Sequence, residues 1–426
     1  MAKIFSYKFS LIVILFFQAT ITCYSQTKIN VRMAMNLART KNINVKTYGY
    51  IIPRERADII TAGLRPNPVF NQQSLFLLDK RYLTAIEPNA NMFTSPYSRQ
   101  TWYQLTKNYQ IAGQRKGKIN FQTKEAEYYE KDVDEYTYNT TYQTAQKWLE
   151  AWYADVNLRI VLLGKKNIDS ILSINKMRFA KGVIPQEEYL RNKIIAEKYN
   201  TLFTSSVQSY KTEIQKLQFL INTNDSIGID SDDFFFNKLL DYKNTDSLIN
   251  YAFMHRPDII TDKAFQKSTT ANVQLQKTLA YPLPEFGLVM NPQNIQPYAG
   301  WYLQIPIPVF SKNQGEIKKA SINNLQAQSQ IEATKMLIET EITYSLQEYE
   351  VNKSNVQRNE EIVENANEVL RIIQYSYLRG GMNFLDFLNG QNTWFDAQKS
   401  YNDAIMQYRK SYLQLLYVTG LLASNN

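Results

Sequence analysis

The stretch Trp301-Tyr-Leu-Gln-Ile-Pro-Ile-Pro-Val-Phe310 leads into Asn313-Gln-Gly-Glu-Ile317, and the two segments have different periods. In the first, apolar residues alternate with polar residues and prolines, as in a strand with one apolar face. From Gly315 onward the spacing is helical. Apolar residues then recur at intervals of seven, at Ile342, Tyr349, Val356, Val363, Leu370 and Tyr377. This interval predicts a long helix that packs against others in a coiled-coil manner.

The same pattern occurs earlier in the chain, at an offset of 198 residues. Trp301 and Leu303 correspond to Tyr103 and Leu105, Gly315-x-Ile317 corresponds to a turn at Gly117-x-Ile119, and Gly380 corresponds to Gly182. On the returning helices, Phe387, Trp394, Tyr401, Tyr408 and Leu415 correspond to Tyr189, Ala196, Phe203, Tyr210 and Leu217. The chain therefore predicts an internal duplication of one unit of strands and long helices.

The predicted domains follow from this duplication. Residues 26–221 form the first repeat, with strands near 68–111 and long helices near 113–180 and 186–221. Residues 222–250 connect it to the second repeat, 251–426, with strands near 284–310 and helices near 315–379 and 384–421. Long proline-free spans favour such helices. Residues 27–65 have helical spacing that Gly63-Leu-Arg-Pro-Asn-Pro68 ends.

Residues 1–25 are predicted to be a secretory signal peptide. Lys3 and Lys8 precede an apolar run, 9–17, that is too short to span a bilayer, and Cys23-Tyr-Ser-Gln26 suits cleavage after Ser25. Cys23 is the only cysteine, and an alternative makes it a lipidated first residue. Either way we expect an exported protein.

The chain lacks the residue patterns that support catalysis. His255 is its only histidine, and no HExxH, GxxxxGK[ST] or paired-cysteine motif occurs. The net charge of +9 is spread over lysines and arginines that lie among acids, without a nucleic-acid footprint. We therefore expect no enzyme, no cofactor, no metal site and no nucleic-acid partner.

The aromatic content, 30 Tyr and 21 Phe, points to a membrane interface. Trp102, Tyr298 and Tyr302 cluster with others at predicted strand ends, where amphipathic rings favour the boundary between lipid and water. The predicted lipid-facing residues are Tyr103, Leu105, Trp301, Leu303, Ile305 and Ile307. Four strands alone would leave open sheet edges in a bilayer, so several chains must close one barrel. A soluble β-sandwich is the alternative interpretation of these strands.

Several segments together resemble the TolC, or outer membrane factor, family. They are Gly63-Leu-Arg-Pro-Asn-Pro68, Arg256-Pro-Asp-Ile259, Pro306-Ile-Pro-Val-Phe310, Asn313-Gln-Gly-Glu-Ile317, and Tyr377-x-x-Gly380 with Asp386-Phe-Leu-Asn-Gly-Gln391. The resemblance covers residues 27–421 and both repeats. Each segment alone is weak, and their combination is highly specific.

The resemblance implies a mainly α-helical protein with a β-barrel part. Four strands from each chain of a homotrimer would form a twelve-stranded transmembrane barrel in outer-membrane lipid. Long antiparallel coiled-coil helices would form an α-helical barrel that extends into the periplasm. Such proteins are passive exit ducts of tripartite efflux pumps or type I export systems. Their partners are a periplasmic adaptor and, through it, an inner-membrane pump.

The resemblance also implies sites at the ends of the helices. Gly182, Gly380 and Gly381 match glycines of the turns that contact the adaptor, and Asp386 matches the first acid of a ring at the periplasmic entrance. Asn389 stands where a second acid would be, and Met382 stands where a gate-locking arginine would be. Because of these two departures, the resemblance does not imply whether the resting gate is open or closed.

Two rival functions belong to other classes. A soluble periplasmic coiled-coil scaffold explains the heptads and leaves the alternating strands unexplained, and an exported hydrolase lacks a catalytic constellation. Neither the cargo nor the kind of pump can be deduced from the sequence.

Overall fold

The computed structural model describes residues 27–89, 91–93, 95–230, 235–236, 244–292 and 296–422. The predicted signal peptide, with Cys23, lies outside these residues. The chain divides into two compact units. Unit 1 comprises residues 1–47, 136–256 and 338–426, and unit 2 comprises residues 48–135 and 257–337. The helices α6 (Gln114–Ala180) and α10 (Gln314–Leu378) contribute residues to both.

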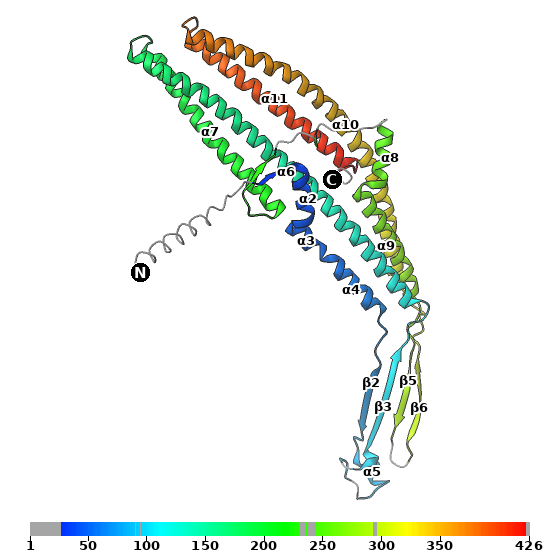
Figure 1. Cartoon of the computed structure of the whole chain (residues 1–426). Coiled ribbons are helices and arrows are strands. Elements are labelled where there is room, and N and C mark those ends of the chain that lie inside the picture. The colour runs from blue at the N-terminus through cyan, green and yellow to red at the C-terminus, as the bar shows by residue number, and fades with distance from the viewer. Residues whose placement is uncertain are drawn as a thin grey trace, which may run out of the picture. The chain divides into compact units, whose positions relative to one another are not determined.

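Two long helical hairpins dominate unit 1. The second part of α6 returns as α7 (Gln186–Ile221), and the second part of α10 returns as α11 (Phe384–Val418). Figure 1 shows both turns at the same end of unit 1. The shorter elements are β1 (Thr27–Ile29), α2 (Val31–Lys41), α3 (Ile43–Gly49), β4 (Ile227–Ile229) and α8 (Thr245–His255).

The predicted heptads form the core of unit 1. On α10, the heptad residues other than Val356 are buried, and Val356 is half-buried. On α11, Phe387, Trp394 and Leu415 are buried, as are two of their counterparts on α7, Ala196 and Leu217. The residues between them, including Tyr401 and Tyr408, are half-buried. This burial confirms the long antiparallel helices that pack in a coiled-coil manner.

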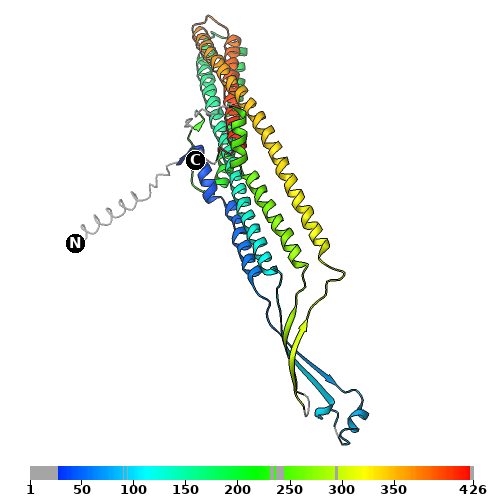
Figure 2. The same cartoon turned by 90° about the vertical axis from the view of Figure 1, so that its right-hand side faces the viewer.

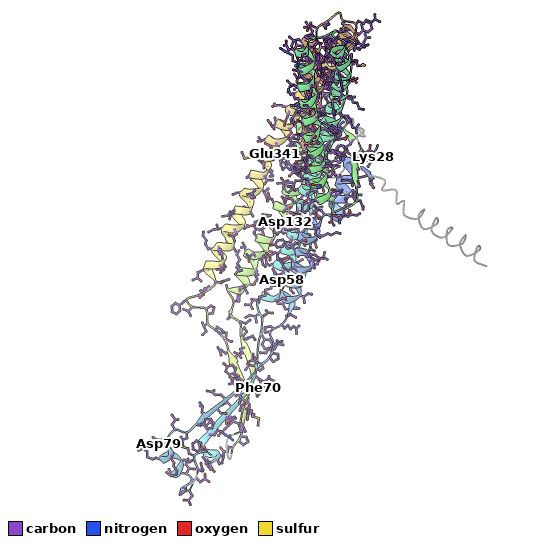
Figure 3. All side chains as sticks on the ribbon, turned by 90° about the vertical axis from the view of Figure 1, so that its left-hand side faces the viewer. Lys28, Asp58, Phe70, Asp79, Asp132 and Glu341 are labelled. Atoms are coloured by element: carbon purple, nitrogen blue, oxygen red, sulfur yellow. The ribbon has the colours of Figure 1, made fainter. Side chains whose placement is uncertain are left out.

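One motif of the sequence has a packing role here. Arg256 is buried, and its Nη1 donates to Glu341 Oε2 at 2.6 Å and to the Val418 carbonyl at 3.1 Å. Glu341, labelled in Figure 3, lies on α10. A buried guanidinium needs such partners, so Arg256, which caps the C-terminal end of α8, links that end to the middle of α10 and to the last residue of α11.

Unit 2 contains helices and a four-stranded sheet. The helices are α4 (Ile51–Gly63), α9 (Pro257–Leu279) and the first parts of α6 and α10. The strands are β2 (Val69–Phe76), β3 (Arg99–Asn108), β5 (Glu285–Asn291) and β6 (Tyr298–Gln304). They lie in the order β2-β3-β5-β6, with antiparallel neighbours. The first hairpin carries α5 (Lys80–Thr84) and the 3-10 helix η1 (Pro96–Ser98) in its outer loop. The sheet is twisted (Figure 2), as expected for L-amino acids.

Some predicted boundaries are wrong. Ile305 and Ile307 lie outside a strand, because β6 ends at Gln304. Pro306 and Pro308 have no N–H, so this segment cannot continue a hydrogen-bonded ladder. Likewise, β3 ends at Asn108 and not near residue 111, and the chain then turns at Ala112 and Gly113 with φ of 51° and 77°.

Two further expectations are corrected. Gly117 and Gly315 do not form turns, since both lie in the first turns of α6 and α10. Residues 27–29, predicted to be helical, are instead strand β1, which pairs in parallel with β4. Trp148 Nε1 donates to the Ile29 carbonyl at 2.8 Å. These partners are distant in sequence, so local periodicity could not reveal them.

Candidate functional site: the two faces of the sheet and the helical turns

The register of the strands divides the sheet into two faces, because paired residues of antiparallel strands point to the same side. Tyr103, Leu105, Trp301 and Leu303 fall on one side, which we call the apolar face. Its rows, read from β2 to β6, are Gln72–Tyr103–Met290–Ala299, Phe70–Leu105–Leu288–Trp301 and, on three strands, Lys107–Phe286–Leu303. Trp301 is 70% exposed and Phe70 is 65% exposed. Beyond β6, Ile305 and Ile307 are also exposed.

Two basic residues mark the limits of the apolar face. Arg99 pairs with Phe76, and Lys107 pairs with Phe286, so both cations lie on this face of β3. Eight positions of a strand span about 27 Å, close to the roughly 25 Å band of a transmembrane barrel. Long cationic side chains can extend to lipid headgroups. The spacing of Arg99 and Lys107 therefore fits the two borders of a bilayer.

The opposite side, which we call the polar face, is rich in amides. These are Asn71, Gln73, Gln100, Gln104, Asn108, Asn291 and Gln304, and the same face carries Trp102, Tyr298 and Tyr302. Among the paired strand residues, Glu285 is the only charged residue on this face. An amide-rich face opposite an apolar one is the alternation of a barrel with lipid outside and water inside.

Gly287 is a structural residue that the sequence analysis missed. It pairs with Thr106, and a Cβ at this position would lie 2.3 Å from the Leu105 carbonyl oxygen and 2.6 Å from Thr106 Cα. Only glycine fits so close to a neighbouring backbone. A glycine inside a strand pattern is the signal that could have identified it.

The two helical turns have matching geometry. Gly182 and Gly380 have φ of 72° and 81°, in the left-handed region that favours glycine. At the first turn, the N–H of Val183 donates to the Arg178 carbonyl at 2.9 Å. At the second, the N–H of Gly381 donates to the Ser376 carbonyl at 2.9 Å. These are bonds of a helix C-cap. Gly381 itself does not have a positive φ, so its role differs from that of Gly380.

Polar contacts join the two hairpins next to these turns. Tyr377 of α10 is buried, and its hydroxyl accepts from Asn175 Nδ2 of α6 at 2.6 Å. The same hydroxyl lies 2.9 Å from Glu188 Oε1 of α7. Burial raises the pKa of Tyr377 to about 12, so the hydroxyl keeps its proton at neutral pH. Arg178 Nη2 donates to the Leu378 carbonyl at 2.7 Å.

A cavity of about 310 Å³, which we call the turn groove, lies between the starts of α7 and α11. It is lined by Pro185, Glu187, Glu188, Arg191, Asn383, Phe384, Leu385 and Leu388. Leu385 is exposed, and Glu187 pairs with Arg191 at 2.6 Å. The groove thus combines an apolar wall with charged side chains.

The predicted gate residues lie at the start of α11. Asp386 is exposed, and its N–H donates to the capping side chain of Asn383 at 2.8 Å. Asn389 is exposed on the same helix, and Met382 is half-buried in the turn before it. An acid in the first turn also stabilises the helix through its dipole. The structure brings the three residues to one end of the hairpin.

The sole histidine has an ordinary structural environment. His255 is exposed and stacks on Tyr251 with ring centroids 4.0 Å apart. In the described part of the chain, no three His, Cys, Asp or Glu side chains group as a metal site would require. None of the described helices is long and apolar enough to cross a membrane.

Comparison with known proteins shows the fold, and part of the chain matches a family model. Residues 248–421 match the model of the family named outer membrane efflux protein. A membrane protein from Pseudomonas aeruginosa has a similar structure, with a TM-score of 0.74, 14% identity, and coverage of 93% of this chain and 91% of that chain. The Campylobacter jejuni outer membrane channel CmeC has a TM-score of 0.69, with 15% identity and coverage of 92% and 85%. The Neisseria gonorrhoeae outer membrane channel MtrE has a TM-score of 0.72, with 14% identity and coverage of 92% and 88%. No curated protein sequence matches the chain.

The fold is thus that of a class of proteins, the outer membrane channels, and the family match over residues 248–421 points to the same class. Proteins of this class are channels and not enzymes. Residues 248–421 match the outer membrane efflux protein family, and the structure of nearly the whole chain is similar to those of outer membrane channels, which supports the resemblance to the outer membrane factor family.

Proposed function

We propose that three copies of this chain close one twelve-stranded barrel in the outer membrane. The observation that carries this proposal is an exposed apolar face on a sheet with two open edges. The sheet order leaves β2 and β6 at the edges, and the strand directions alternate. Consequently, β6 of one copy can pair antiparallel with β2 of the next. Closure removes the unpaired backbone groups, which a bilayer does not tolerate.

In this assembly, the sheet and the helical hairpins lie in different environments. The sheet lies in outer-membrane lipid, and the helical hairpins form the periplasmic extension of a passive exit duct. Residues 1–25 act as the signal peptide for export. A soluble scaffold is disfavoured, because so exposed an apolar face would associate non-specifically in water.

The turn groove is the docking place for a periplasmic adaptor, and through it for an inner-membrane pump. Gly182 and Gly380 shape the two turns beside it, and Gly381 supplies a capping N–H. Leu385 and Leu388 offer apolar contact, while Glu187 and Arg191 offer polar contacts at the border. Such a combination suits the end of a partner helical hairpin.

Three copies of Asp386 form the charged ring of the periplasmic entrance. Asn389 and Met382 contribute no charge, so the ring holds one acid per chain and lacks a tether from a cationic side chain. A confined negative ring attracts cations. We expect moderate cation preference and a loosely held resting gate. Planar-bilayer recording of Asp386→Asn tests this, since unchanged ion selectivity would show that Asp386 does not line the pore.

Native mass measurement of the protein extracted in detergent tests the assembly. The expected result is a trimer that fractionates with the outer membrane. A stable monomer, or a protein released without detergent, would contradict the proposed barrel and favour the scaffold.

A further inference from the structure

Positive charge gathers where the sheet of unit 2 joins its helices. Four chain segments make this junction, between α4 and β2, β3 and α6, α9 and β5, and β6 and α10. Figure 1 shows them between the sheet and the helices of unit 2. Cations lie in or next to three of these segments. We call the following set the basic collar: Arg65, Lys107, Lys116, Lys118, Lys312 and Lys318.

The charge of the basic collar is not compensated within the chain. Farther along α6, Lys124 Nζ lies 2.7 Å from Glu127 Oε2. At the start of α10, Glu316 Oε2 lies 3.8 Å from Lys319 Nζ, outside the collar. Among the described residues, no acid lies within ion-pair distance of a collar side chain. The collar can therefore attract an anion from outside the chain.

The basic collar borders the apolar face of the sheet. Lys107 lies on that face, in its last row toward the helices. The pairing of β3 continues beyond it, since the N–H of Tyr109 donates to the Pro284 carbonyl at 2.8 Å. Glu285, the acid at this level of the strand ladder, lies on the polar face. Lys107 is thus on the side that the proposed barrel turns to lipid.

Exposed apolar side chains accompany the cations. Ile307 and Phe310, between β6 and α10, are exposed, and Lys312 follows them. Leu64, next to Arg65, is exposed as well. Such neighbours suit the boundary between lipid and water, where apolar groups contact acyl chains and long cationic side chains reach the headgroups.

The other end of the sheet is less basic. In the outer loop, Arg81 Nη2 pairs with Asp79 Oδ2 at 2.7 Å, and the remaining described cations there are Lys80 and Arg99. Each cation near an anionic membrane surface strengthens attachment roughly fivefold. The excess of unpaired cations therefore favours anionic lipid at the border toward the helices.

On the basis of the barrel proposed above, we infer that the basic collar binds anionic phospholipid headgroups in the periplasmic leaflet of the outer membrane. The lysines and Arg65 donate to phosphate oxygens, while Ile307 and Phe310 reach the acyl chains. This contact fixes the depth of the barrel in the membrane. It also makes the stability of the trimer depend on the charge of the surrounding lipid.

Neutralisation of four lysines tests the collar. The glutamine variant combines Lys107→Gln, Lys116→Gln, Lys312→Gln and Lys318→Gln, and the arginine variant places Arg at the same four positions. The matched control removes the same charge from exposed lysines of unit 1 that have no ion-pair partner among the described residues: Lys166→Gln, Lys176→Gln, Lys193→Gln and Lys198→Gln.

Native mass spectrometry measures the binding. Purified trimers in a zwitterionic detergent are titrated with phosphatidylglycerol or with phosphatidylcholine of equal chain length. The unmodified protein should prefer the anionic lipid roughly tenfold, and the glutamine variant should lose this preference to within about twofold. The arginine variant and the control should keep it. Phosphatidylglycerol should also raise the melting temperature of the unmodified trimer, and not that of the glutamine variant.

The preference of the unmodified trimer should fall with added salt, because salt screens exposed charges. This measurement and the arginine variant decide the question even where the glutamine variant does not assemble. A preference that survives in the glutamine variant would overturn the inference, as would an equal loss in the control. An unmodified protein that is a stable monomer would instead contradict the barrel itself, so the two failures are distinguishable.

Discussion

The sheet of unit 2 and the helical hairpins of unit 1 use the same kinds of side chain in opposite ways. Trp394 and Phe387 of α11 are 6% and 0% exposed, whereas Trp301 and Leu288 of the sheet are 70% and 63% exposed. Helices in water must bury apolar side chains against one another. A sheet in lipid can leave them exposed, because hydrocarbon is their solvent. The difference shows that the helical hairpins build an apolar core of their own, whereas the four-stranded sheet has no second layer over its apolar face.

Phe387→Ala should have the largest effect. This ring packs in a buried cluster with Tyr377 and Phe384, so its removal leaves a cavity that should cost about 3–5 kcal/mol. Chemical unfolding followed by helical circular dichroism measures this cost. Phe76→Ala, at an exposed position of the sheet, is the control. Equal losses of unfolding free energy in both variants would show that the two units do not differ in how they use apolar side chains.

Leu288→Arg tests the solvent of the sheet. Leu288 pairs with Leu105 and Trp301 within the apolar band, so arginine there should cost roughly 2–4 kcal/mol. Leu303→Arg lies in the row of Lys107, at the border, and should cost about 0–1 kcal/mol. Heat-stable trimer recovered from membranes is the measurement. Similar yields from both variants would mean that the apolar face does not contact lipid.

Gly287→Ala tests how closely β5 packs against the backbone of β3. The added methyl group would meet backbone atoms of β3, which should cost about 1–3 kcal/mol through overpacking. Gly300→Ala is the matched control, because the nearest atom to its Cβ is Val289 Cγ1 at 3.8 Å. Thermal stability of the assembled barrel should fall only in the first variant. A fall in both would point to a loss of backbone flexibility.

Gly380→Ala should have the smallest effect on stability, about 1–2 kcal/mol, from a left-handed backbone that alanine disfavours. No atom lies within 4 Å of its added Cβ, so the cost is conformational and not steric. Gly381→Ala is the control, since its φ is not positive. Helical melting measures the difference. An export defect in Gly380→Trp with normal trimer would in addition support adaptor contact at this turn.

Much of this architecture could be predicted from periodicity. Intervals of seven identified the buried line from Ile342 to Tyr377, and alternation identified the apolar face with Leu105 and Trp301. The strand ends were misplaced where Pro306 and Pro308 continued the apolar alternation without the capacity to pair. At the helical turns, the sequence indicated the glycines and Asp386, and it did not indicate the turn groove between α7 and α11. The partners of Tyr377 could not be predicted, because Asn175 and Glu188 come from other helices.

By itself, the sequence determined the kinds of element, their lengths and their duplication, since these depend on periods and on local backbone preferences. The tertiary structure decided which segments meet. Register placed most of the amides of the sheet on one face and both of its cations on the other, and it left room only for glycine at position 287. Tertiary contacts also brought β1 beside β4. Such pairings depend on contacts between residues far apart in the chain, where local propensity has no influence.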